Sequence, residues 1–147
     1  DWTENGSATT WNIIYGPAGF NPATSGTTVV TTNKPDTLLG LTSNTDYEVY
    51  IAADCGSPQG MSDTTGPVAF TTPCSPIAGF PYLEEFTTWP PVCWDLTGGA
   101  NTVTQYSGSS VEAGFWGWSS GEAWMTSPIF DVSTLTTPFM DFDWSHQ

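Results

Sequence analysis

Apolar and polar side chains alternate along two segments in the first half of the chain. Trp11, Ile13 and Tyr15 fall on one face of the first segment when it is built as an extended strand. Residues 47–53 repeat the pattern, with an apolar or aromatic side chain at every second position. This period of two is typical of half-buried strands in an antiparallel sheet. We find no stretch of about a dozen residues with apolar side chains at helical spacing, and the sequence therefore predicts an all-β fold.

Shorter apolar and β-branched runs predict further strands in the same half. Turn clusters rich in Asn, Asp, Gly and Pro separate them, and many short strands at this spacing predict a β-sandwich. These additional candidate strands are residues 27–32, 37–41 and 68–71.

The composition of the chain changes near residue 74. Pro73 and Pro76 lack the backbone donor that a central strand needs, and six of the eight tryptophans follow them. We therefore predict one domain over residues 1–73, a linker over residues 74–81 and a second domain over residues 82–147.

The charge of the chain excludes several classes of partner. Fifteen carboxylates and a single basic residue, Lys34, give a formal net charge of −14. Nucleic-acid binding needs Lys and Arg to neutralise phosphates, and an anionic membrane surface would repel the chain for the same reason. No apolar run approaches the ~20 residues that cross a bilayer, so membrane insertion is not expected. Only 11% of the residues are charged, against about 25% in an ordinary domain, and a Thr-, Gly- and Pro-rich chain of this kind predicts an extracellular or cell-surface protein.

A Leu, a polar turn and a Tyr follow one another over residues 41–47, where Tyr47 opens an alternating strand. This arrangement resembles the tyrosine corner of β-sandwiches, in which the Tyr hydroxyl bonds to upstream backbone. Together with Trp2 on an early strand, Trp11 on the next strand and the closing run at residues 68–72, it makes residues 1–73 resemble a fibronectin type III domain whose first strand is missing. The resemblance implies a fibronectin type III-like sandwich.

Three motifs in the second half occur in a characteristic order. Residues 80–86 carry two acidic residues before a Phe, residues 90–94 read Pro-Pro-Val-Cys-Trp, and residues 123–133 contain a Ser-Pro pair. In this order they resemble the opening of a MAM-type or adhesin-type jelly roll of secreted Bacteroidota proteins. Residues 139–144 would be its next strand, and residues 82–147 would then be a partial jelly roll, roughly half of such a domain.

Three cysteines allow one disulfide and one unpaired thiol, which points to an oxidising compartment. Secreted bacterial fibronectin-like repeats, which the first half resembles, carry Cys-Gly after the Tyr strand and Thr-Thr-x-Cys at the exit. This resemblance implies a bond between Cys55 and Cys74, which would close a loop of about 18 residues and contribute about 3 kcal/mol. The alternative is a bond between Cys74 and Cys93, with Cys55 free.

Acidic residues in the second half predict calcium binding. Calcium takes about six to eight oxygen ligands, and in the adhesin-type jelly rolls that this half resembles, an acidic residue of the opening strand helps to hold a structural calcium. The matching residues here are Glu84 and Glu85, with Asp141 or Asp143 as companions. The competing interpretation is that all four are solvated surface carboxylates.

Two other kinds of site are suggested by short patterns. Trp116 and Trp118 lie two residues apart and would share one face of a strand, either as a platform for glycan stacking or as part of the core. Thr37 and Thr64 each follow an aspartate, which resembles the Asp-Thr acceptor pattern of glycosylation in Bacteroidota.

Catalysis is not expected from these residues. The only histidine, His146, lies one residue from the end of the chain, and a serine or cysteine nucleophile needs a base to activate it. The sequence therefore predicts non-catalytic adhesion or spacer modules of a large secreted or cell-surface bacterial protein. Their partners would be other domains or subunits of a surface assembly, or an extracellular glycan. The alternative is a pair of accessory modules, tethering or glycan-binding, of a secreted hydrolase.

Overall fold

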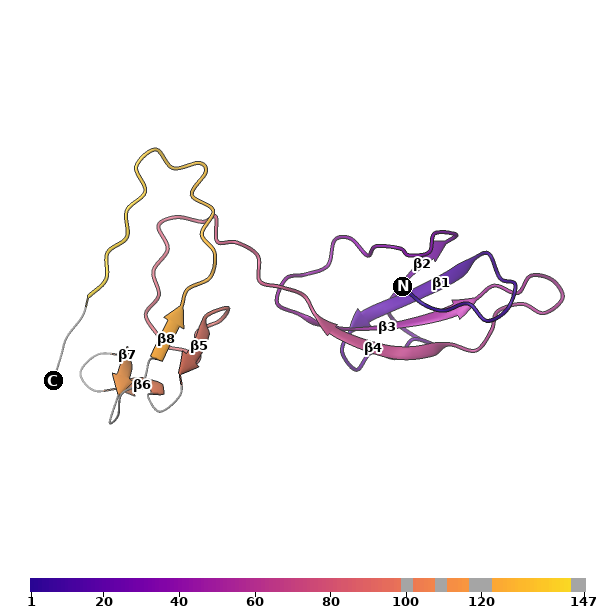
Figure 1. Ribbon diagram of the computed structural model, residues 1–147, viewed down its shortest axis with the longest axis horizontal. Helices are drawn as coiled ribbons and strands as arrows, with labels where there is room; N and C mark the ends of the chain where they lie inside the picture. Colours follow the sequence, from indigo (N-terminus) through magenta and orange to yellow (C-terminus); the bar gives the residue numbers. More distant parts are fainter. Residues whose placement is uncertain (99–101, 108–110, 117–122, 144–147) are drawn as a thin grey trace. The chain divides into compact units, whose positions relative to one another are not determined.

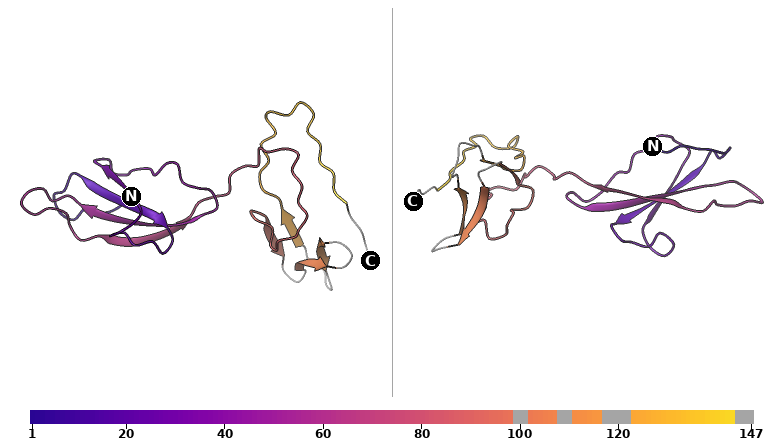
Figure 2. Two further views of the ribbon diagram at one scale, coloured as in Figure 1. Left: turned by 180° about the vertical axis from the view of Figure 1, so that it is seen from behind. Right: turned by 60° about the horizontal axis from the view of Figure 1, so that its bottom comes forward.

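The computed structural model describes residues 1–98, 102–107, 111–116 and 123–143 (Figures 1 and 2). The chain divides into two compact units, Asp1–Pro73 and Cys74–Gln147. All regular elements among the described residues are β-strands that pair antiparallel within their sheets, which confirms the all-β class. Those residues contain no helix that is long and apolar enough to cross a membrane.

One four-stranded sheet forms the body of the first unit. Its strands are β1 (Trp11–Pro17), β2 (Thr27–Thr31), β3 (Asp46–Ala53) and β4 (Thr65–Thr71) (Figure 1). They pair in the order β2-β1-β3-β4. β1 and β3 pair along the whole of β1, from Trp11 opposite Ala53 to Pro17 opposite Tyr47. The two alternating segments of the sequence therefore share one face of the sheet, as their period of two requires.

The core of the first unit lies on this shared face. Trp11, Ile13 and Tyr47 are its most buried large side chains, with 7%, 6% and 8% of their surface exposed. Tyr47 stacks on Phe70 of β4, with ring centroids 5.9 Å apart. Trp2 packs edge-on against Trp11 at 5.3 Å, so residues before β1 cover part of this face.

Residues 1–10 and 32–45 form no strand, although the sequence predicts strands at Trp2 and at residues 37–41. Gly40 has a φ of +71°, which interrupts an extended backbone within the second segment. Leu39 is 80% exposed, so this apolar run contributes little to the core. The second sheet of a sandwich is not formed within residues 1–73, and the fibronectin type III form of the sandwich stays a prediction.

Tyr47 makes the hydrogen bond that the sequence predicts for a tyrosine corner. Its hydroxyl accepts the backbone N–H of Thr42, five residues upstream, at 3.1 Å. Asn44 lies between them in the left-handed region, with a φ of +46°, which Asn tolerates better than most residues. The bond fixes the turn at residues 42–46 onto the beginning of β3.

The opposite face of the sheet is partly covered by Phe20. Its ring packs edge-on against Tyr50 at 5.6 Å and lies directly over Gly16. A Cβ added at Gly16 would come within 2.8 Å of the Phe20 ring, and one added at Gly26 would clash with the same ring. The ring therefore occupies space that two glycines leave open.

Glu4 ties the residues before β1 to the sheet. Its Oε2 accepts the indole N–H of Trp11 at 2.7 Å, and its Oε1 accepts the backbone N–H of Gly6 at 2.6 Å. These two bonds, together with the charge of Lys34, hold the pKa of Glu4 below its ordinary value. A depressed folded-state pKa means that ionised Glu4 stabilises the fold above its unfolded-state pKa, and that this contribution is lost as the pH falls through the folded-state pKa.

We expect the native chain to lose thermal stability more steeply than Glu4→Gln between about pH 5 and pH 3. Gln can still accept the Trp11 N–H through its amide oxygen but carries no charge that titrates in this range. Melting temperatures followed by circular dichroism at successive pH values measure the difference. Equal slopes for the native chain and Glu4→Gln would contradict this role of Glu4.

The second unit contains two two-stranded sheets among its described residues. They consist of β5 (Asp95–Gly98) with β8 (Ala123–Thr126), and β6 (Thr102–Ser107) with β7 (Val111–Trp116). Residues 139–143 form no strand, and Phe139 and Phe142 are 86% and 77% exposed. The strand predicted over residues 139–144 is therefore not formed in its described part, while Trp144 lies outside the described residues. The jelly-roll architecture stays a prediction.

Residues 74–81, which the sequence predicts as a linker, fall within the second compact unit. The N–H of Ile77 donates to the carbonyl of Ile129 at 2.8 Å, and the N–H of Asp131 donates to the carbonyl of Ile77 at 2.9 Å. The Phe80 ring lies against Phe130 at 6.3 Å. Pro73 and Pro76, which suggested a linker, lack a backbone N–H. Ile77, which follows them, uses both its backbone N–H and its backbone carbonyl in these hydrogen bonds.

The disulfide joins Cys74 to Cys93, and Cys55 is a free, exposed cysteine. The predicted bond between Cys55 and Cys74 is therefore wrong, and the alternative pairing is the one formed. β3 and β4 run antiparallel with Asp46 opposite Thr71, so Cys74 follows the end of β4 that lies beside the beginning of β3. Cys55 lies nine residues beyond Asp46, about 30 Å away along the strand at about 3.3 Å per residue. A disulfide requires Cα atoms within about 7 Å of each other.

Candidate functional site

A cleft beside the Cys74–Cys93 disulfide is the candidate site in the second unit. Its volume is about 400 Å³, within the range of roughly 300–1,000 Å³ that small-ligand sites occupy. Cys93 itself lines the cleft. Its other lining residues include Ser75, Ile77, Tyr82, Glu84, Thr87 and Pro91.

Glu84 is the charged group of the cleft, and its carboxylate is held by two internal donors. The Tyr82 hydroxyl donates to Oε2 at 2.9 Å, and the backbone N–H of Phe86 donates to Oε1 at 2.8 Å. Phe86 has a φ of +54°, in the left-handed region that non-glycine residues seldom adopt. The turn at residues 84–86 is therefore built around this carboxylate.

Aromatic rings surround the turn. Phe86 packs edge-on against Trp94 at 5.7 Å, and Tyr82 packs edge-on against Phe130 at 5.3 Å. The indole N–H of Trp94 is buried and makes no hydrogen bond. Partial burial raises the pKa of the Tyr82 hydroxyl. The nearby indole N–H of Trp94 lowers this pKa, although it does not reach hydrogen-bond geometry. The carboxylate of Glu84 raises the pKa further.

The chemistry of the cleft is that of a hydrogen-bond acceptor in a partly apolar surrounding. A carboxylate has about four lone-pair sites, so Glu84 can accept further donors beyond Tyr82 and Phe86. The sequence of the second unit contains no Lys or Arg, which leaves this negative charge without such a basic neighbour in its own unit. The cleft therefore favours a ligand that brings N–H or O–H donors.

The four residues of the predicted calcium site are not brought together. No three Asp, Glu, His or Cys side chains in the described part of the chain form a group that could hold a metal ion. Glu84 accepts hydrogen bonds from Tyr82 and Phe86, while Glu85, Asp141 and Asp143 are exposed. Calcium binding stays a prediction.

The structure describes only one of the two tryptophans of the predicted glycan platform. Trp116 is the last residue of β7, opposite Thr102 of β6. Trp118 lies outside the described residues. The choice between a glycan platform and a core position is therefore not tested.

The two predicted glycosylation sites, Thr37 and Thr64, are both exposed and both lie outside strands. Thr37 follows Asp36, whose carboxylate accepts the Thr37 backbone N–H at 2.7 Å. Thr64 immediately precedes β4. A modifying enzyme could reach both hydroxyls, but the modification itself stays a prediction.

Sequence reasoning identified Glu84 but not the arrangement around it. Tyr82, Glu84 and Phe86 are spaced two apart, and this spacing was a signal that the three could act together. The signal was ambiguous because a period of two also describes an ordinary strand. What distinguishes the turn is the positive φ of Phe86, which the sequence does not reveal.

Comparison with protein-family models, with curated proteins and with solved structures found no match. The fibronectin type III and MAM-type resemblances therefore depend on the motifs quoted from the sequence. The all-β class depends instead on the strands themselves, and it does not need either resemblance.

Proposed function

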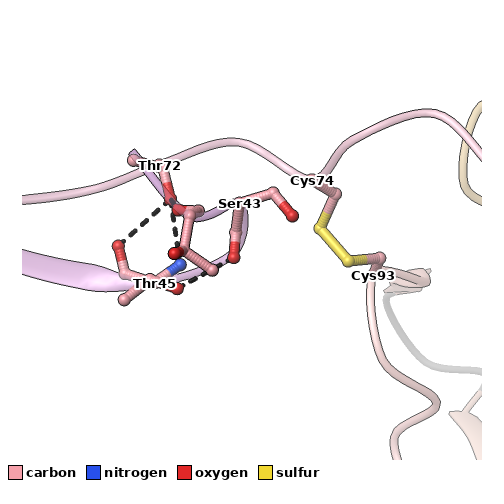
Figure 3. Close-up of a disulfide and its surroundings, with 6 residues drawn as sticks. Ser43, Thr45, Thr72, Cys74 and Cys93 are labelled. Atoms are coloured by element: carbon pink, nitrogen blue, oxygen red, sulfur yellow. Dashed lines mark hydrogen bonds between the residues drawn. A yellow bond between two sulfur atoms is a disulfide. The ribbon is translucent and has the colours of Figure 1, made fainter. Parts of the chain in front are cut away.

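We propose that this chain is a tandem of two non-catalytic β modules that serve as an adhesion or spacer segment of a large secreted or cell-surface protein. The main support is the way the chain is held where it passes from one unit to the next. Figure 3 shows the residues that hold it.

Thr72 anchors the end of the first unit to the turn before β3. Its backbone N–H donates to the carbonyl of Thr45 at 3.0 Å. Its hydroxyl accepts the N–H of Thr45 at 3.0 Å and lies 3.2 Å from the Thr45 carbonyl oxygen (Figure 3). The same hydroxyl donates to the carbonyl of Thr42 at 2.6 Å. The carbonyl of Pro73 accepts the N–H of Asn44 at 3.2 Å.

Cys74, the next residue, is covalently bonded to Cys93 of the second unit. The chain therefore passes from a hydrogen-bonded anchor to a covalent one without a free segment between them. A segment that transmits tension between other parts of a surface protein benefits from such anchors, because neither unit begins to unravel at the connection. This is the arrangement expected of a spacer.

The compartment and the partners belong to the same proposal. A disulfide is typical of oxidising compartments outside the cytosol, and the threonine-rich composition, with only 11% charged residues, is compatible with an extracellular surface. The partners would be other domains or subunits of a surface assembly, or an extracellular glycan.

Pulling the chain by its two ends tests the anchored connection. Under oxidising conditions the residues between Cys74 and Cys93 should stay closed while the strands unfold. Reduction should add about 60 Å to the fully extended length, since 19 residue steps at about 3.4 Å each replace the 6.0 Å between the two Cα atoms. Single-molecule force spectroscopy measures this increment.

Two results would contradict the proposal. One is an extended length that does not differ between oxidised and reduced chains, which would show that the covalent anchor is not formed. The other is hydrolysis of peptide, ester or glycoside substrates by the purified chain, which would show that it is an enzyme. The Cys74→Ser/Cys93→Ser chain is the matched control for the first measurement, because it should give the reduced length under both conditions.

A further inference from the structure

The two edges of the first unit's sheet differ in how they are protected from pairing with another strand. β4 contains Gly66 and Pro67, and its register with β3 shifts between Val49 and Ile51. Proline has no backbone N–H to donate, and an irregular register bends the strand. Both features hinder pairing between the edges of two sheets. β4 is therefore a protected edge.

β2 has none of these devices. Its five residues are Thr-Thr-Val-Val-Thr, without Pro, Gly or a charge, and they pair with β1 in unbroken register from Thr31 opposite Trp11 to Thr27 opposite Tyr15. Within residues 1–73, the backbone hydrogen bonds of β2 are those it makes with β1. Its outer edge carries no backbone pairing within this unit. Val30 in this strand is 67% exposed, whereas Thr31 at the end of the strand is 7% exposed.

We propose that β2 pairs antiparallel with β2 of a second copy of this chain, centred on Val29. The strand is nearly palindromic, so this register places Val29 opposite Val29, Thr27 opposite Thr31 and Thr28 opposite Val30. β-Branched pairs are favourable neighbours across strands, and no charge meets a like charge. The inference goes beyond the proposed function, and either could fail without the other.

Charge decides how the association should depend on salt. Each copy carries a formal charge of −14, so two copies repel each other at long range. The Debye length falls from about 30 Å at 0.01 M salt to about 10 Å at 0.1 M, which removes most of this repulsion without weakening backbone hydrogen bonds. The pairing should therefore strengthen as salt is added. A strand of five residues is small beside the ~800 Å² per partner of a standard interface, so the dimer should be weak.

Sedimentation velocity of the whole chain between about 10 μM and about 1 mM tests the proposal in this weak range. We expect a concentration-dependent dimer that is favoured at about 0.5 M over about 0.02 M NaCl. Hydrogen exchange of the native chain should show added protection of β2 amides at the higher concentrations. That second measurement needs no variant.

Two paired variants test the register. Thr28→Glu/Val30→Glu places Glu opposite Glu twice and should weaken the dimer by about tenfold or more. Thr28→Lys/Val30→Glu places Lys opposite Glu twice and should restore the dimer or strengthen it. Thr64→Glu/Thr65→Glu adds the same two negative charges at the beginning of β4, and it should leave the dimer unchanged apart from a small salt-dependent loss.

Each outcome bears on the proposal. A chain that stays monomeric to about 1 mM at high salt overturns it. A dimer that persists in Thr28→Glu/Val30→Glu, or that forms without added protection of β2, also overturns it by placing the contact elsewhere. Melting temperatures confirm that each variant is folded, and hydrogen exchange of the native chain decides the question if a variant does not fold.

Discussion

Replacing both Cys74 and Cys93 with Ser is expected to lower the free energy of unfolding of the second unit by about 3 kcal/mol. The bond closes a loop with a sequence separation of 19, and closing a loop of this length restricts the unfolded chain by about that amount in the chain-entropy model. We expect the second unit to depend strongly on this bond, because several of its large apolar side chains are exposed. Leu83, Ile129 and Phe139 are 78%, 73% and 86% exposed.

Chemical denaturation of the whole chain, followed by tryptophan fluorescence, measures this effect. Six of the eight tryptophans lie in the second unit, so its transition dominates the signal. Cys55→Ser is the matched control, since Cys55 is exposed and forms no disulfide and surface substitutions usually change stability by less than about 0.5 kcal/mol. A second-unit transition at the same denaturant concentration with and without the disulfide would contradict the expectation.

Trp11→Ala is expected to lower the free energy of unfolding of the first unit by about 3–5 kcal/mol. The side chain is 7% exposed, and it lies beside Ile13 on the buried face of the sheet. Its removal also takes away the edge-on contact with Trp2 and the N–H that Glu4 accepts. Cavity formation and the loss of these two contacts therefore act in the same direction.

Leu39→Ala is the control for Trp11→Ala. Both substitutions remove a large apolar side chain from the same unit, but Leu39 is 80% exposed and should cost less than about 0.5 kcal/mol. Circular dichroism during urea unfolding follows the sheet in both variants. Comparable losses for Leu39→Ala and Trp11→Ala would show that the core does not lie on the face assigned to it.

The central pair of strands could be predicted from the sequence because its signals are local. The alternation at Trp11, Ile13 and Tyr15 reports directly on which side chains are buried. Tyr47 follows its turn closely enough that its bond to Thr42 spans only five residues. Both features depend on neighbours in sequence, and the structure confirms both.

The remaining features depend on neighbours in space, and the sequence does not contain that information in readable form. The run at residues 37–41 has the composition of a strand, but a strand also needs a hydrogen-bonded partner, and none lies beside it in residues 1–73. The cysteine pairing could not be predicted for the same reason. Cys55 and Cys74 follow successive strands, and the antiparallel direction of those strands separates them.

The Phe20 ring over Gly16 and Gly26 has a consequence for how this sequence can vary. An alanine at either glycine would collide with the ring. A smaller side chain at position 20 would leave room for it at position 16, but not at position 26, where φ is +100° and an added Cβ would also lie 3.0 Å from the backbone carbonyl of Tyr15. Positions 16 and 20 are therefore not independent during evolution. Among descendants of this sequence, a methyl group gained at position 16 should be accompanied by a loss of bulk at position 20, whereas Gly26 should be retained.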